Sequence, residues 1–197
     1  MNKKSVAAST LIVFLAIFFS IVGVCFSMFV FKDTKIEVKT IKLVSAEGIE
    51  IYGDKDLKQA VTELKLSKME LGLKPATGEL DAETKIPSTI NDQGTSEGYY
   101  SKIYVKSNSA FKLFVEDVEI ESKKYADKVD AERENIFVAI KDAGGVAKNL
   151  KEDKTELATF SNIEDAKELV IYIWLDSLAG EELEGAVISF VLNFVAV

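Results

Sequence analysis

The amino-acid sequence predicts a mainly β protein: an antiparallel, jelly-roll-like β-sandwich with one short helix, preceded by an N-terminal transmembrane or signal helix. Three observations lead to this fold class. Apolar residues alternate with other residues in several stretches, most clearly in 169–176 and 186–197, and a period of two is typical of strands. Turn sequences rich in Ser, Asn and Gly separate the stretches. Hydrophobic residues make up 48% of the 197-residue chain, which suffices to bury a core.

Residues 1–31 are interpreted as a signal peptide or a membrane anchor. Lys3 and Lys4 precede an uncharged stretch that runs over residues 5–31. As a helix this stretch is about 40 Å long, more than the roughly 30 Å of a bilayer's hydrocarbon core. Cleavage and retention both remain open. Because the two lysines stay inside, residues 32–197 are expected on the extracellular side, anchored in the membrane or secreted to the cell surface.

Composition argues against several classes of function. Residues 32–197 carry 22 basic and 32 acidic residues, a net charge of −10, and Arg133 is the only arginine, so no nucleic-acid partner is expected. The chain has no His, which removes the commonest general base and His-based zinc sites. The single cysteine, Cys25, lies in the apolar N-terminal segment. No enzyme activity, catalytic residue, cofactor or metal is therefore expected.

One extracellular domain is predicted over residues 32–197. Residues 36–43 alternate with a phase shift of one, which predicts a strand with a bulge. A second short strand is expected at 49–52. Residues 54–64 show a 3.6-residue apolar period behind Asp54 and Asp56, which predicts the short helix.

A long exposed loop is predicted over residues 74–98, which contain both prolines and few large apolar side chains. Loops of this length are either functional or mobile. Further strands are expected at 99–106, 111–115, 135–140, 169–176 and 186–197. Apolar residues occupy both faces of 169–176, so this strand is expected to be buried on both sides.

Five residues are assigned to the core: Trp174, Ile188, Phe190, Leu192 and Phe194. Trp174 lies within an alternating apolar strand, which favours a core position over ligand stacking.

Tyr100 and Tyr104 are candidate surface aromatics, because they share the polar face of their strand with two lysines. Cross-strand packing is the alternative explanation. The acidic turn with Glu181, Glu182 and Glu184 lacks the spacing of a calcium loop and is interpreted as solvated.

Two parts of the chain resemble the TasA/camelysin family of secreted Gram-positive surface and biofilm-matrix proteins. At 31–34, Phe-Lys-Asp-Thr is similar to the sequence that follows the signal in that family. At 173–176 and 188–194, Ile-Trp-Leu-Asp and the closing apolar strand look like the family's tryptophan strand and terminal strand. The resemblance implies a jelly-roll-like cell-surface domain that assembles or adheres by β-strand addition. Camelysin is described as a peptidase, an activity not expected without His or a His-Glu-x-x-His motif.

These observations predict an exported structural or adhesive surface protein, of which a biofilm-matrix fibre subunit is one form. The candidate assembly strand is 34–44, whose Ile36 and Val38 would enter a neighbouring subunit's sheet edge. An ordinary first strand is the alternative. The alternative function is a membrane-anchored binding module whose long loop holds a ligand or partner protein. Expected partners are the membrane, through the N-terminal segment, and other copies of the chain or other surface proteins.

Overall fold

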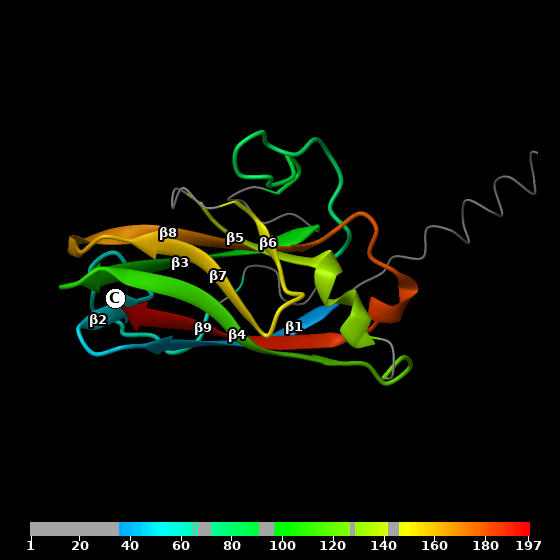
Figure 1. Cartoon of the computed structure of the whole chain (residues 1–197), viewed down its shortest axis with the longest axis horizontal. Coiled ribbons are helices and arrows are strands. Elements are labelled where there is room, and N and C mark those ends of the chain that lie inside the picture. Colours follow the sequence, from blue (N-terminus) through cyan, green and yellow to red (C-terminus); the bar gives the residue numbers. More distant parts are fainter. Residues whose placement is uncertain (1–35, 65, 67–71, 91–96, 127–128, 142–145) are drawn as a thin grey trace, which may run out of the picture. The chain divides into compact units, whose positions relative to one another are not determined.

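Two β-sheets, stacked as layers, make up most of the described part of the chain (Figure 1). The structure is a computed structural model that describes residues 36–64, 66, 72–90, 97–126, 129–141 and 146–197. The expected signal or anchor segment, 1–31, lies outside the described residues. Among the helices of the described part, none has the length and apolarity to cross a membrane. Both sheets belong to the unit Thr34–Val197, so the fold is the predicted β-sandwich.

The first sheet has four strands in the order β1-β9-β4-β7. They are β1 (Glu37–Ser45), β9 (Val187–Ala196), β4 (Phe111–Glu121) and β7 (Lys154–Phe160). The β9–β4 and β4–β7 pairs are antiparallel, whereas β1 pairs with β9 in parallel. The expectation of a purely antiparallel sandwich is therefore wrong at this one pair, which joins the first and last strands of the unit.

The second sheet has five antiparallel strands in the order β2-β3-β8-β5-β6. They are β2 (Ile49–Tyr52), β3 (Gly98–Ser107), β8 (Ile163–Leu175), β5 (Ile136–Lys141) and β6 (Lys148–Asn149). The chain crosses from this sheet to the first between β3 and β4, at a short turn of Ser and Asn residues. In the described part, the helical elements are two short 3₁₀ helices, η2 (Val129–Asn135) and η3 (Glu181–Leu183).

The main core fills the space between the two sheets and draws residues from all the long strands. Phe111 of β4 is fully buried in it, with its ring 4.8 Å from that of Phe160 and 5.9 Å from that of Phe194. Four residues of β9 expected in the core are buried here: Ile188, Phe190, Leu192 and Phe194. The alternation of β9 thus places one face in the core throughout most of its length.

Residues 169–175 of β8 are buried on both faces, as their sequence predicts, whereas residues 163–168 of the same strand are mostly exposed. One face, with Ile171 and Ile173, belongs to the core between the sheets. The other face, with Tyr172 and Trp174, packs in a second cluster on the outer side of the five-stranded sheet. Trp174 is only 2% exposed.

The long loop rises from this side of the five-stranded sheet (Figure 1), and residues 77–83 are exposed, as expected, whereas a few apolar residues nearer its ends pack on the outer face. Ala76 and Ile90 pack in the cluster with Trp174. The amide of Ala76 donates to the carbonyl of Leu175 at 2.8 Å, and the amide of Ala147 donates to Thr84 at 2.8 Å. Ala76, Ile86 and Ile90 therefore cover part of the second cluster, while Leu80 stays exposed.

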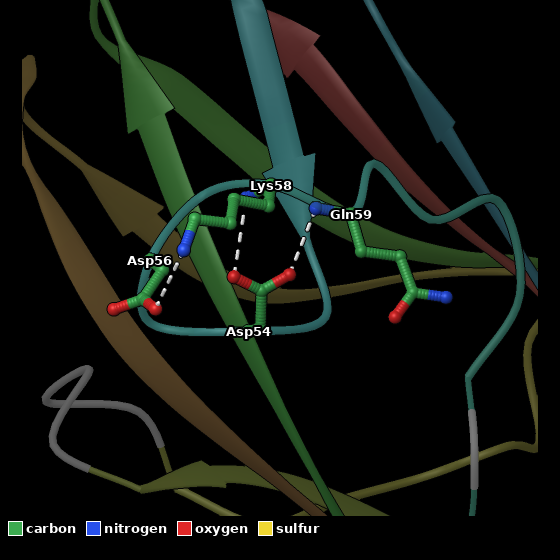
Figure 2. Close-up of polar contacts among 4 residues, drawn as sticks. All are labelled: Asp54, Asp56, Lys58 and Gln59. Atoms are coloured by element: carbon green, nitrogen blue, oxygen red, sulfur yellow. Dashed lines mark hydrogen bonds and ion pairs between the residues drawn. The ribbon is translucent and has the colours of Figure 1, made fainter.

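The predicted helix over 54–64 does not form. Asp54 instead closes a turn, because its carboxylate accepts the amides of Lys58 at 3.1 Å and Gln59 at 2.8 Å (Figure 2). Leu57 has a φ of +57°, which an α-helix does not allow. The chain then continues in an extended form along the exposed edges of two strands, where it finds backbone partners that a short isolated helix would lack.

Candidate functional site

The candidate assembly strand, β1, lies at one end of the four-stranded sheet. Ile36, just before β1, is fully buried, and Val38, Ile41 and Leu43 of β1 are buried beside it in the main core. The register along β9 shifts between Val38 and Thr40, which confirms the bulge predicted from the phase shift. In this structure β1 occupies its own sheet, with its apolar face inward and its parallel hydrogen bonds on β9.

The other edge of β1 is covered by residues 59–64, here called the edge segment. The amide of Leu43 donates to the carbonyl of Thr62 at 2.8 Å, and the amide of Leu64 donates to Ile41 at 2.9 Å. The same segment reaches the second sheet, where the amide of Val61 donates to the carbonyl of Ile51 in β2 at 3.1 Å. The edge segment therefore covers the edges of both sheets on this side and protects them from unwanted pairing.

Two bulges flank Ser189 near the start of β9. On one side, Thr40 follows the β1 bulge and pairs with Ser189; on the other, Glu119 pairs with Ser189 after the bulge of β4. Asp117, in the β4 bulge, has a φ of +51°, a conformation uncommon for residues other than Gly. Bulges are frequent beside functional sites because they redirect side chains.

The bulges open a groove of about 690 Å³ on the outer face of the four-stranded sheet. One wall carries Lys39 and Lys42, and the other carries Asp117 and Glu119. The first wall belongs to β1. The groove, here called the bulge groove, is therefore complete only when a strand occupies the position of β1.

Arg133 supports the β4 bulge from η2. Its guanidinium donates through Nη2 to the carbonyl of Val118 at 2.7 Å and through Nη1 to Asp153 at 2.8 Å, and its Nε lies 2.6 Å from Asp130. The side chain is 17% exposed. The only arginine of the chain thus has a structural role in this part of the molecule, holding a backbone carbonyl that the bulge removes from the sheet ladder.

Glu116 links three strands of the same sheet. Its Oε1 lies 2.5 Å from the ammonium of Lys154 on β7, and its Oε2 accepts the amide nitrogen of Asn193 on β9 at 2.9 Å. The side chain of Glu116 is 20% exposed. Hydrogen bonding from Lys154, and then from Asn193, holds the pKa of Glu116 below its ordinary value.

We expect Glu116→Gln to lower the free energy of unfolding by about 1 kcal/mol at about pH 7, because the charged hydrogen bond to the partly exposed Lys154 is weakened. Since the folded pKa of Glu116 is depressed, its stabilisation is present above the ordinary value of 4.5 and is lost as the pH falls through the lower folded value. Urea unfolding at about pH 7 and about pH 3 should therefore show a difference that shrinks in acid. The exposed Glu119→Gln is the control, and an equal loss at both pH values would contradict the assignment.

A second concavity, of about 350 Å³, lies between the long loop and the end of β8. Its walls include Phe137, Trp174, Leu80 and Pro87. The rings of Phe137 and Trp174 are stacked, with centroids 5.7 Å apart. This concavity, here called the loop pocket, is mostly apolar: Phe137, Trp174 and Leu175 come from the strands, and Leu80 and Pro87 come from the loop.

The two candidate surface aromatics occupy different surroundings on the outer face of β3. Tyr104 is half-buried, and its hydroxyl donates to Glu168 Oε2 at 2.7 Å, while Lys102 lies 3.3 Å from Glu168 Oε1. The hydrogen bond to Glu168 raises the pKa of Tyr104. Tyr100 is also half-buried and packs against the cluster of Trp174. The two rings therefore do not form one exposed adhesive patch.

The acidic turn folds into η3, and across the described residues no group of three acidic side chains is arranged to hold a metal ion. Sequence reasoning missed the Glu116 cluster and the Arg133 support, because each depends on strands brought together from distant parts of the chain. Comparison of the chain with protein-family models, with curated proteins and with solved structures finds no match.

Proposed function

We propose that this protein is an exported cell-surface structural or adhesive subunit that assembles by β-strand addition, with β1 as the exchanged strand in a jelly-roll-like domain. The uncharged segment over residues 5–31 supports export, as a signal or as an anchor. The observation that carries assembly is the position of β1. It is the first strand of the described unit, it lies at a sheet edge, and four buried side chains attach it to the core: Ile36, Val38, Ile41 and Leu43.

Strand addition joins backbone pairing with side-chain pockets that set the register. A β1 strand from another copy would make the same parallel ladder with β9 and would rebuild the basic wall of the bulge groove. The turn between β1 and β2 contains Gly48, whose φ is +84°, and is the natural hinge. Domain swapping exchanges an identical element between copies through such a hinge loop.

The test removes β1 and supplies it again. Residues 46–197 are expected to be largely unfolded alone, because they lack four core side chains, and to regain native circular dichroism when a synthetic peptide of residues 34–45 is added. A peptide carrying Ile36→Lys and Ile41→Lys should fail, whereas the matched control with the outward-facing Lys39→Ala and Lys42→Ala should succeed. In parallel, residues 32–197 should form oligomers on refolding at high concentration.

Three results would overturn strand addition. One is a folded 46–197 with unchanged stability, one is equal rescue by the matched and the mutated peptides, and one is refolding of 32–197 to monomers at every concentration.

The loop pocket favours a second candidate, a membrane-anchored binding module. Its largely apolar walls, half built by the long loop, are of the kind that hold a ligand. Electron microscopy of purified residues 32–197 separates the two candidates, since an assembling subunit gives filaments or oligomers that lengthen with concentration and a simple binding module gives single particles.

A further inference from the structure

Leu178 is the most exposed large apolar side chain in the described part of the molecule. It is 81% exposed and lies in the turn that follows β8. This turn is ordered by Asp176, whose Oδ1 accepts the amide of Leu178 at 2.8 Å and whose carbonyl accepts the amide of Ala179 at 3.0 Å. Leu178 is therefore an apolar knob on a well-braced turn, and a pre-ordered knob loses little freedom when it enters a pocket.

The loop pocket lies directly beside this knob. Asp176 and Ser177, the two residues before Leu178, line the pocket. Across the pocket, on the loop side, is Leu80, which is 61% exposed. A volume of about 350 Å³ with a stacked Phe137 and Trp174 pair is large enough for a leucine side chain. Knob and pocket lie next to each other, and the chain does not fill its own pocket.

The rim of the loop pocket carries opposite charges on its two sides. Lys85 lies on the loop side and Asp176 on the β8 side. One donor of the Lys85 ammonium is used by the carbonyl of Ala82 at 2.8 Å, which leaves two for another acceptor. A two-fold axis between knob and pocket would bring Lys85 of each copy to Asp176 of the other, and Leu178 of each copy into the other's pocket.

We propose that the loop pocket is a docking site for a second copy of this chain, with Leu178 as the reciprocal knob and the Lys85–Asp176 pair as its polar rim. A two-fold contact requires one surface that is complementary to itself, and a neighbouring knob and pocket with opposite charges across the rim meet this condition. The site lies on the outer face of the five-stranded sheet. It is separate from β1, so it pairs copies independently of strand addition.

The test uses residues 32–197, since both sheets and both apolar clusters lie within this unit. Trp174 is the only tryptophan, so its fluorescence reports directly on the pocket. With rising concentration, sedimentation should show a monomer–dimer equilibrium, and the fluorescence emission of Trp174, which lines the pocket, should shift over the same range. Leu178→Asp should weaken the dimer at least about 10-fold, since it places a charge in an apolar pocket, and Lys85→Glu should weaken it by a smaller factor.

The control is Val44→Asp, which changes an exposed apolar residue of the other sheet and should leave the dimer unchanged. A protein that stays monomeric at every concentration, or a dimer that Leu178→Asp does not weaken, would overturn the proposal. Rescue of 46–197 by the β1 peptide should be the same with and without Leu178→Asp, so failure of this dimer and failure of strand addition are distinguishable.

Discussion

Replacing Trp174 with alanine is expected to lower the free energy of unfolding by about 3–5 kcal/mol, the range for truncating a large buried aromatic residue. The side chain is 2% exposed and stacks on Phe137 beneath the loop. Its removal leaves a cavity. The loop and the strand cannot fully close this cavity, because backbone hydrogen bonds such as that from Ala76 to Leu175 fix their positions. Chemical unfolding followed by circular dichroism measures the effect.

Leu178→Ala is the control for Trp174→Ala, because an 81% exposed side chain should contribute less than about 0.5 kcal/mol. A loss below about 1 kcal/mol for Trp174→Ala would show that the indole is not part of a packed cluster in solution. The amides of Ala76 and Ala147, which donate to Leu175 and Thr84, should exchange faster with solvent in this variant, because they attach the loop that Trp174 supports.

Phe111→Ala is expected to lower the free energy of unfolding by a similar amount, about 3–5 kcal/mol, for a different structural reason. Phe111 is fully buried between the sheets and its ring contacts those of Phe160 and Phe194, so its removal weakens the contact between the layers. Aromatic pairs add about 0.5–1.5 kcal/mol beyond the area they bury. The same unfolding experiment measures it.

Hydrogen exchange separates the two large effects. In Phe111→Ala the loop amides of Ala76 and Ala147 should exchange only through global unfolding. In Trp174→Ala they should exchange through a local opening whose free energy is lower than that of global unfolding. Phe111→Leu, which keeps most of the apolar volume, should recover more than half of the loss. If Phe111→Ala increased the exchange of the loop amides alone, the two clusters would not be separate units.

Strand β9 and residues 169–175 of β8 could be predicted from the sequence because apolar residues recur there without interruption, whereas residues 163–168 of β8 are polar and mostly exposed and were not predicted. The two-sided burial of β8 could also be predicted, since apolar residues occupy both of its faces. The cover of its outer face could not, because it comes from residues 74–90, whose contacts with Trp174 are distant in sequence. Pro87 and the polar residues around it are typical of an exposed loop, and only the tertiary contact distinguishes a loop that packs from one that does not.

Strand β7 was missed for a local reason. Its register with β4 shifts between Leu113 and Phe114, so one residue of β7 is extra at that point. Leu157 and Ala158 are consequently both buried although they are adjacent, and the alternation that identifies a strand is lost. The Glu116 cluster depends on β7 through Lys154, so it could not be assembled from the sequence.

The short helix was wrongly predicted because four apolar residues at helical spacing are weak evidence when they stand alone. The same residues serve an extended segment equally well: Val61 packs against the core and Leu64 is buried in it. Asp54, interpreted as a helix cap, does accept backbone amides, but the turn it closes leads back to the sheet edges. A capping residue shows where a turn begins, and the conformation of the next residues depends on the partners they find.

The parallel pairing of β1 with β9 has a consequence for the order of events during synthesis. Val38 pairs with Ile188, so the first strand of the domain waits for nearly the whole chain before its ladder can form. Closing so long a loop is slow, and until β9 has emerged the apolar face of β1 has no partner in its sheet. A chain still being made therefore stays open, which is the condition in which a polypeptide is threaded through a membrane pore. In an exported chain, the domain could not close until β9 had also crossed to the far side of that pore, because β1 pairs with β9.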